Sequence, residues 1–325
     1  MKREMRHLIV DCDPGVGVPG RNVDDGLALA LAAGLPDAWL EQVTIVSGNT
    51  PAPLGFASAR TLLEDWGIDV PVAMSGTEPL SETALYHRDR LDRPGLDPAV
   101  QRAWAGVPEP RNYVADRRTA ATAIIEAVEG APGRIDLIAT GPLTNIAAAV
   151  QAVPGLPDKL RSLTIMGGAL SVPGYRVETN FSYDPDSAAA VLSCGAPITL
   201  VSMDATTRTM LTAGDLDCLE EIDSGMARSL IPAVRPWVDY SASTRGIRGC
   251  WIHDAAAVAV VLRPEIATYS DVSVEIALQG PDRGKTTFAS SGPIVRIVET
   301  IDNSALLGLL RDALLGARRR ERTSA

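Results

Sequence analysis

The sequence predicts an α/β fold built on an open, mostly parallel sheet with helices on both faces. Short apolar runs rich in β-branched residues alternate with Ala/Leu-rich segments of helical period, and the strand-like runs are apolar on both faces. The predicted strands are 7–10, 43–47, 136–139, 163–166 and 198–203. The predicted helices between them are 25–33, 57–66, 119–128, 143–150 and 187–192.

The C-terminal third departs from this alternation. Runs 272–278 and 294–298 predict an added β-hairpin or edge pair, and residues 205–250 predict helices and loops over one end of the sheet. No Ser- or Gly-rich linker divides the chain. We therefore expect one catalytic domain over residues 1–316, followed by a basic, disordered tail over residues 317–325.

Composition excludes several classes of protein. Of 325 residues, 46% are apolar and 4% are aromatic, which is enough apolar material for a sizeable aliphatic core and excludes disordered and fibrous classes. The 30 Lys and Arg residues against 40 Asp and Glu residues give a formal charge of −10, which argues against nucleic acid as a partner.

The sequence also predicts a cytoplasmic protein with no membrane partner. The N-terminal apolar run, 8–10, is too short for a signal peptide, and the longest strong apolar run, 255–262, is too short to span a bilayer. The cysteines are scattered without a C-x-x-C pair, so a disulfide scaffold or a zinc site is not expected.

Polar side chains follow several predicted strands at the point where each strand ends. Asp11 and Asp13 follow the first strand, Asn49 follows the second, and Thr140 and Gly167-Gly168 follow two later ones. Open α/β sheets bind ligands at the carboxyl ends of their strands. These loops are therefore expected to converge on one crevice.

A cluster of aspartates marks the first strand-to-helix turn. Asp11 and Asp13 leave the strand, and Asp24 and Asp25 open the following helix. These carboxylates cannot all be ionised together without a counter-charge, so the cluster needs shared protons or a bound divalent cation. Oxygen ligands without Cys or His favour Ca²⁺ or Mg²⁺ over zinc. The competing interpretation is that Asp24 and Asp11 only cap a helix and a turn.

Three functions would use such a cluster. One is attack by water on a sugar with the help of Ca²⁺. A second is a Mg²⁺ phosphohydrolase of D-x-D type with Asp11 as nucleophile, although that chemistry needs a downstream lysine and lysines are scarce here. A third is a pentose- or nucleoside-binding protein that grips hydroxyl groups without turnover.

Motifs that follow one another in a fixed order along the chain favour the first of these functions, attack by water on a sugar. D-C-D-P-G at 11–15 and D-D-G-L-A at 24–28 resemble the signature of the inosine–uridine-preferring nucleoside hydrolase family. Further pieces resemble that family in the same order, namely V-S-G-N at 46–49, T-G-P-L-T-N at 140–145, M-G-G at 166–168, E-T-N at 178–180, D-P at 184–185, V-S-M-D-A-T at 201–206 and H-D at 253–254. The resemblance runs from Asp11 to about Val260 and implies a Rossmann-related nucleoside hydrolase-like fold.

The resemblance implies calcium-dependent hydrolysis of the N-glycosidic bond of ribonucleosides to ribose and free base, an activity of purine or pyrimidine salvage. It implies that Ca²⁺ is held by Asp13, Asp25, Asp254 and the carbonyl of Thr140, and that Asp13 is the general base for a calcium-bound water. A single displacement by water would invert the anomeric centre.

The resemblance also implies contacts to the substrate. His253 is expected to contact or protonate the leaving base, with Trp251 stacking on the base and His87 reaching in from a loop. Residues expected to bind the sugar or to support those that do are Asp24, Asn49 and Asn180 for ribose hydroxyls, Glu178 for the 5′ end, and Asp11 for orienting its neighbours. Relatives are commonly dimers or tetramers, so we expect a homo-oligomer.

The sequence departs from the usual family pattern in a few places. Residues 16–23 separate D-P-G from the double aspartate, which resembles a longer-loop variant. Tyr175 stands where an asparagine that contacts the 5′-hydroxyl is expected, and a His-Gly-x-x-Gly-Leu loop is represented only by His87 and Gly95-Leu96. No pattern in the sequence decides which base is preferred.

Overall fold

A computed structural model describes residues 3–75, 83–115 and 117–323 of the chain. Its central feature is a nine-stranded sheet with the strand order β10-β9-β11-β6-β5-β4-β1-β2-β3. The strands are β1 (Arg6–Cys12), β2 (Ala38–Ile45), β3 (Val72–Met74), β4 (Ile135–Ala139), β5 (Ser162–Met166), β6 (Ile198–Val201), β9 (Ala267–Ile276), β10 (Thr286–Phe288) and β11 (Ile294–Ile301).

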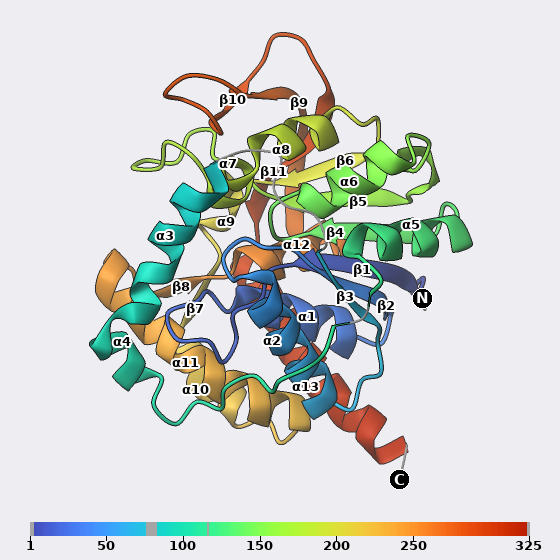
Figure 1. The fold of residues 1–325 in the computed structure, drawn as a ribbon. Helices are drawn as coiled ribbons and strands as arrows, with labels where there is room; N and C mark the ends of the chain where they lie inside the picture. Colours follow the sequence, from blue (N-terminus) through green and yellow to red (C-terminus); the bar gives the residue numbers. More distant parts are fainter. Residues whose placement is uncertain (1–2, 76–82, 116, 324–325) are drawn as a thin grey trace.

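The sheet is parallel from β3 to β11, and only β9 and β10 run antiparallel to their neighbours. The predicted mostly parallel sheet and the predicted edge pair are therefore confirmed. In Figure 1, β9 and β10 extend beyond the rest of the sheet at the top of the view. Because β1, β4, β5 and β6 point the same way, the loops that follow them open at one edge.

Helices cover both faces of the sheet, and β1 shows why. Leu8 and Val10 belong to one buried cluster and Ile9 belongs to the other, as expected for alternating side chains on a strand. The first face is covered by α1 (Asp24–Gly34), α2 (Ala52–Asp65), α12 (His253–Leu262) and α13 (Asn303–Thr323). The second face is covered by α5 (Ala120–Gly130), α6 (Thr144–Ala152) and α8 (Pro185–Leu192).

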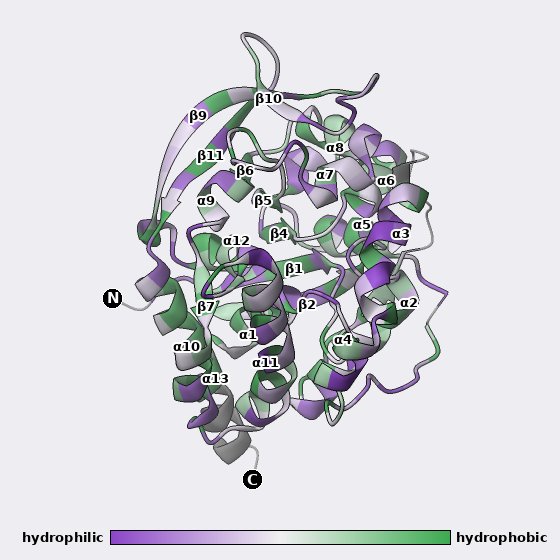
Figure 2. Ribbon diagram, turned by 90° about the vertical axis from the view of Figure 1, so that its left-hand side faces the viewer, coloured by the Kyte–Doolittle hydropathy of each residue, from purple (hydrophilic) through white to green (hydrophobic). Residues whose placement is uncertain are grey.

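The two helices whose first turns carry aspartates are central to this packing. All eleven residues of α1 are buried, and α1 packs against α12 and α13. All ten residues of α12 are buried as well. Figure 2 shows these helices mostly in hydrophobic colours, whereas β9 is largely pale and the arginine-rich α3 (Thr83–Leu96) is largely hydrophilic.

Further elements lie around the carboxyl edge of the sheet. They are α4 (Pro98–Ala103), α7 (Thr179–Tyr183), α9 (Met203–Thr206), α10 (Ala213–Glu220), α11 (Gly225–Arg245), β7 (Met210–Thr212) and β8 (Gly249–Trp251). Short 3-10 helices elsewhere are Pro157–Lys159, which precedes β5, and Pro264–Ile266, which precedes β9. The expected helices between residues 205 and 250 are present. The antiparallel ribbon of β7 and β8 was not predicted, because three-residue strands are too short to show a period.

Three other expectations concern the ends and the cysteines. Helix α13 continues past residue 316 to Thr323, while residues 324–325 lie outside the described residues, so the domain division stays a prediction. The four cysteines, all in described positions, are unpaired. Within the described ranges, no helix combines the length and the apolar character that crossing a membrane requires.

Candidate active site

The end of β1 and the start of α1 bring carboxylates together from both sides of an inserted loop. Asp11 lies within β1 and Asp13 just beyond it, while Asp24 and Asp25 form the first turn of α1. Acidic side chains are favoured there because the N-terminus of a helix carries partial positive charge. Residues 16–23 form a mostly buried loop, and they return the chain so that Asp24 and Asp25 face the end of β1.

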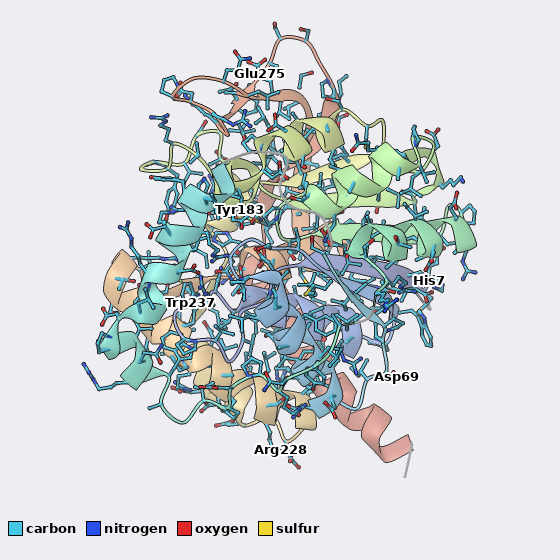
Figure 3. All side chains as sticks on the ribbon, in the orientation of Figure 1. His7, Asp69, Tyr183, Arg228, Trp237 and Glu275 are labelled. Atoms are coloured by element: carbon cyan, nitrogen blue, oxygen red, sulfur yellow. The ribbon has the colours of Figure 1, made fainter. Side chains whose placement is uncertain are left out.

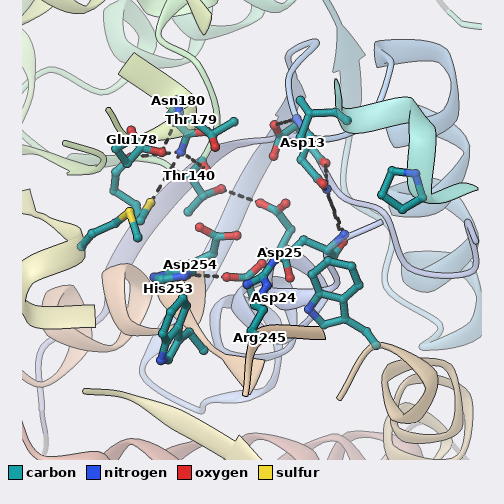
Figure 4. Close-up of a pocket in the computed structure, with 18 of the residues that line it drawn as sticks. Asp13, Asp24, Asp25, Thr140, Glu178, Thr179, Asn180, Arg245, His253 and Asp254 are labelled. Carbon is teal, nitrogen blue, oxygen red and sulfur yellow. Dashed lines mark hydrogen bonds between the residues drawn. The ribbon is translucent and has the colours of Figure 1, made fainter. Parts of the chain in front are cut away.

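The first turn of α12 completes the cluster. Carboxylate oxygens of Asp24, Asp25 and Asp254 all lie within 4.8 Å of one another, and all three residues are buried. The backbone N–H of Asp254 donates to Asp24 Oδ2 at 3.3 Å, whereas Asp24 Oδ1 is buried without a hydrogen-bond partner among the described residues. Figure 4 shows the three side chains directed toward a common space.

Asp13 sits beside this group and is held by the loop after β2. The backbone N–H of Asn49 donates to Asp13 Oδ2, and a hydrogen bond joins the carboxyl groups of Asp13 and Asp25. Gly48 is required for this approach, since a Cβ at that position would overlap Asp13 Oδ2. The V-S-G-N motif therefore serves to bring a backbone donor to Asp13.

The negative charge of the carboxylates in this cluster is not balanced by cationic side chains among the described residues. Burial raises the pKa of Asp25 to about 7, and the charge of Asp24 adds to the effect. Burial also raises the pKa values of Asp13 and Asp254 well above the usual range, with neighbouring carboxylates as the next cause. Among the salt bridges between described residues, none includes these carboxylates. A cation is the simplest way to keep them ionised together.

Asp11 has a different position from the other aspartates. It is fully buried, and its Oδ1 accepts hydrogen bonds from Thr44 Oγ1 at 2.6 Å and Asn145 Nδ2 at 2.8 Å. Burial raises the pKa of Asp11 to about 7 despite these two hydrogen bonds. Asp11 does not line the cavity described below. Its hydrogen bonds join β1 to Thr44 on β2 and to Asn145 on α6.

Thr140, Glu178 and Asn180 form a second wall next to the aspartates. Thr140 Oγ1 donates to Asp25 at 2.7 Å, and the Thr140 carbonyl accepts from Asn180 Nδ2 at 2.8 Å. Glu178 caps α7 by accepting from the backbone N–H groups of Asn180 and Phe181, and it also accepts from the N–H of Gly168 after β5. Its pKa is nevertheless raised, because burial outweighs these bonds.

Helix α3 is fastened to these loops by arginines. Arg88 donates to the carbonyl of Gly48 at 2.6 Å and to that of Asn49 at 3.0 Å, and Arg21 donates to the same Asn49 carbonyl at 3.0 Å. Both arginines also bind Asp92 on α3. The peptide that donates to Asp13 is thus itself held by Arg88, which links α3 and the inserted loop to the cluster.

The aspartate cluster and the wall beside it line a cavity of about 320 Å³, which lies within the range of small-molecule sites. Ten of the predicted site residues line it: Asp13, Asp24, Asp25, Asn49, Thr140, Glu178, Asn180, Trp251, His253 and Asp254. The side-chain amide of Asn49 is engaged within the loops, through Asn22 and Thr50. His87 does not line the cavity, and its ring lies 6.2 Å from that of Tyr183.

The end of the cavity opposite Thr140 and Asn180 is aromatic. His253 Nδ1 lies 2.6 Å from Thr206 Oγ1, which fixes the orientation of the imidazole ring. Burial lowers the pKa of His253 to about 4, so the ring is neutral at physiological pH. The ring of Trp251 lies 5.7 Å from that of His253, and the ring of Tyr175 lies 6.1 Å from that of Trp251.

Sequence reasoning placed the base pocket in segments 75–95 and 225–251 but singled out none of the residues that α11 contributes to this aromatic end. Trp237, Tyr240, Thr244 and Arg245 line the cavity from the last turns of α11. Figure 3 marks Trp237 on α11 and Tyr183 on α7. The i, i+3, i+7 spacing of Trp237, Tyr240 and Thr244 places them on one helix face and could have indicated a common surface. Nothing in that spacing tells a cavity wall from a core.

Fold and site together define a class of protein. A parallel sheet whose strand ends carry a buried aspartate cluster, beside an aromatic pocket, matches the nucleoside hydrolases. The model of the family "Inosine-uridine preferring nucleoside hydrolase" matches residues 8–308. The chain belongs to this family and is an enzyme that hydrolyses the N-glycosidic bond of nucleosides.

Curated relatives and solved structures agree with this assignment. The chain is 29% identical to a probable uridine nucleosidase 2 of Arabidopsis thaliana, with 96% of this chain and 98% of that protein covered. It is 27% identical to the pyrimidine-specific ribonucleoside hydrolase RihB of Shigella flexneri, again covering 96% and 98%.

Among solved structures, the plant nucleoside hydrolase PpNRh1 superposes with a TM-score of 0.80 at 27% identity, over 95% of this chain and 99% of that one. A purine-preferring ribonucleoside hydrolase from Gardnerella vaginalis also gives 0.80, at 25% identity, over 97% and 100%. The names of these relatives differ in the base they specify.

Proposed function

We propose that this nucleoside hydrolase is a calcium-dependent N-ribohydrolase in which Asp13 accepts the proton of the attacking water. The observation that carries the proposal is the buried cluster of Asp13, Asp24, Asp25 and Asp254 at one end of a cavity whose other end is aromatic. A ribose has hydroxyl groups for the polar end, and a base has a flat face for the aromatic end.

The donor set fits a hard divalent cation. Its members are carboxylate and carbonyl oxygens, and oxygens of Asp25 and Asp254 lie within 4.8 Å of each other while no salt bridge between described residues neutralises them. Asp13, Asp25, Asp254 and the Thr140 carbonyl would hold Ca²⁺. When bound, Ca²⁺ would neutralise the carboxylates, lower the pKa of water and orient the ribose hydroxyls. Asp24 belongs to the same cluster of oxygens, and we assign it to the ribose hydroxyls.

The reaction adds one water across the glycosidic bond. The water oxygen bonds to the anomeric carbon as the C1′–N bond breaks, and the electron pair of that bond leaves with the base. Asp13 takes one proton from the water and later releases it to solvent, and the departing base takes up one proton, so that charge balances over the cycle. The carboxylates around the anomeric carbon stabilise the oxocarbenium character of the transition state.

The remaining walls position the substrate. Asp24 and Asn180 bind ribose hydroxyls, with Asn49 beside them, and Glu178 lies at the 5′ end. His253 faces the leaving base and Trp251 stacks on it. The buried, hydrogen-bonded setting of Glu178 and Asn180 keeps them in one orientation before substrate arrives. A homo-oligomeric state stays a prediction.

The structure offers no support for the D-x-D phosphohydrolase. Its nucleophile would be Asp11, which is fully buried, accepts two hydrogen bonds and does not line the cavity. A pentose- or nucleoside-binding protein would use the same cavity, and turnover separates it from an enzyme.

The test is release of reducing sugar from inosine, adenosine, guanosine, uridine and cytidine. The protein is assayed after removal of metal by a chelator, and again after Ca²⁺ or Mg²⁺ is restored. Ribose that appears only with Ca²⁺ supports the proposal. Equal activity in the chelated protein would contradict the metal requirement, and tight nucleoside binding without ribose would show a binding protein.

A further inference from the structure

Arg88 is joined to the proposed general base through a single peptide group. Its Nη1 donates to the carbonyl of Gly48 at 2.6 Å, and the N–H at the other end of that same peptide, that of Asn49, donates to Asp13 Oδ2. The guanidinium, the peptide and the carboxylate thus form one chain of hydrogen bonds that begins at a cation and ends at an anion. Hydrogen bonds in such a chain polarise one another, and those to charged groups are the stronger ones.

A second guanidinium holds the next peptide of the same loop. Arg88 Nη2 and Arg21 Nη1 each donate to the carbonyl of Asn49 at 3.0 Å. Asp92 on α3 accepts from both arginines, through Arg88 Nε at 2.9 Å and through Arg21 Nη2. Every nitrogen of the Arg88 guanidinium therefore donates a hydrogen bond, and two consecutive carbonyls of the loop after β2 are held from α3.

Both arginines act from outside the cavity. Neither Arg88 nor Arg21 lines it, although other residues of α3 do. The Arg88 side chain is 18% exposed and that of Arg21 is 7% exposed, so neither is a solvated surface group. Arg21 lies in the inserted loop 16–23. Arg88 directly follows His87, at the place where the family pattern has a glycine, so both arginines belong to segments that depart from that pattern.

We propose that Arg88 is a positioning residue for the hydrolysis, because it holds the Asn49 peptide in the orientation in which the N–H fixes the carboxylate of Asp13. Arg21 and Asp92 support Arg88 in that place. The inference rests on the proposed role of Asp13 as general base. A carboxylate with one oxygen held by a polarised donor keeps a single orientation, so the lone pairs that receive the proton of the water keep one direction. Without Arg88 the peptide reorients, and Asp13 loses that direction.

A purely structural role is the alternative for Arg88. It also fastens α3 to the loop after β2, and α3 forms part of the cavity wall. In that case, replacing Arg88 would lower stability or raise KM through a looser wall, and the change would not depend on the contact between Asn49 and Asp13. A positioning role instead predicts a fall in kcat at nearly constant KM, together with a dependence on that contact.

The first experiment measures kcat and KM of the Ca²⁺-loaded protein on the best ribonucleoside of the panel. Arg88→Met keeps the apolar stem without donors, and Arg88→Lys keeps the charge and a donor. Arg93→Met is the matched control, because Arg93 lies on the same helix and its side chain, 72% exposed, pairs with Asp89. We expect Arg88→Met to lower kcat by about tenfold to a hundredfold with KM within about threefold of wild type. Arg88→Lys should lie between the two, and Arg93→Met should match wild type.

The second experiment places the same change in a protein whose contact between Asn49 and Asp13 is already broken. A Cβ at Gly48 overlaps Asp13 Oδ2, so Gly48→Ala displaces the carboxylate from the N–H. In this background Arg88→Met should lower kcat by no more than about threefold, because both changes act through one hydrogen bond. A further loss as large as the one in wild type would overturn the inference. A kcat near wild type in Arg88→Met alone, or a loss confined to KM, would overturn it as well.

Asp92→Asn decides the question if Arg88→Met does not fold. The Asp92 side chain is 38% exposed, and its replacement leaves both arginines in the chain, with Asp89→Asn as the matched control on the same helix. We expect Asp92→Asn to lower kcat by about threefold to tenfold and Asp89→Asn to leave it unchanged. Equal kcat values for these two variants would overturn the inference. Failure of the proposed function looks different, since wild type would then release no ribose or Asp13→Asn would keep its turnover.

Discussion

The two ends of the cavity are built in different ways. The aspartate end rests on β1, α1 and α12, where Asp24, Asp25 and Asp254 are buried and joined to backbone and side-chain donors. The aromatic end rests on the last turns of α11 and on β8, where Trp237 is buried but Arg245 is exposed and has no hydrogen-bond partner among the described residues.

This difference separates chemistry from selectivity. The carboxylates of Asp24, Asp25 and Asp254 are buried at helix N-termini, so the fold fixes the positions of the groups that we assign to the metal and the ribose. An exposed side chain at the end of a helix, such as Arg245, can be exchanged at little cost to stability. Relatives named as pyrimidine-specific and as purine-preferring match this chain over nearly its whole length, which is consistent with a selectivity that varies while the fold stays the same.

The largest effect should come from the aspartate end. Asp13→Asn keeps the size of the side chain but removes the proposed general base, so kcat should fall by about a thousandfold or more. The measurement is the initial rate on the best substrate of the panel at saturating Ca²⁺, with circular dichroism as the control for folding. Turnover near the wild-type rate in this variant would remove Asp13 from its role.

A change in the sugar should be nearly as costly. 2′-Deoxyinosine leaves Asp24 without a hydroxyl partner, and its kcat/KM should be at least about a hundredfold below that of inosine. Asp24→Asn should narrow this ratio while Ca²⁺ still binds, as measured by titration calorimetry. If Asp24→Asn abolishes Ca²⁺ binding instead, Asp24 is a metal ligand and not a ribose contact.

An intermediate effect should follow from crowding Asp13. Gly48→Ala places a Cβ against Asp13 Oδ2 and displaces the carboxylate from the Asn49 N–H, so kcat should fall by about tenfold to a hundredfold. Gly130→Ala is the matched control, because a Cβ there meets no atom within 4 Å and Gly130 ends the surface helix α5. Equal kcat values for the two variants would show that the position of Asp13 tolerates movement.

The smallest effect should arise at His87, beyond the lining of the cavity. Burial lowers the pKa of His87 to about 4, and the charge of Arg90 adds to the effect. The folded state therefore favours neutral His87, and its contribution to stability is present above about pH 6.5 and is lost as the pH falls toward 4. His87→Gln should reduce the fall in Tm between pH 7 and pH 5 by about 2 to 4 °C.

The same variant also tests the boundary of the site. Because His87 does not line the cavity, His87→Gln should leave kcat and KM at pH 7 close to wild type. A large rise in KM would instead show that His87 contacts the substrate when the cavity is filled.

The aspartate end was predictable from the sequence, whereas of the aromatic end only Trp251 and His253 were predicted. Asp13, Asp25 and Asp254 lie at strand ends and helix starts, where hydrophobic periodicity fixes the position along the chain and a parallel sheet fixes the common edge. The backbone roles of Gly48 and Asn49 follow from contacts over long sequence separations, which no local pattern contains.

The helix α11 could be predicted as helical, but its orientation over the cavity depends on packing against α10 and α2. No pattern in the sequence therefore singled out Trp237 and Arg245 within the segment 225–251 that was expected to carry the base pocket. The strand β2 also begins at Ala38, earlier than expected, since its first half alternates exposed and buried residues and lacks a continuous apolar run.

The most direct test of the proposed mechanism is the anomer of ribose that is released first. Proton NMR during the first minutes of inosine hydrolysis, before the anomers of free ribose equilibrate, distinguishes α-ribose from β-ribose. Direct attack by the water that Asp13 deprotonates inverts the β-glycosidic centre and predicts α-ribose. Initial release of β-ribose would indicate a covalent ribosyl intermediate and would contradict the single-step mechanism.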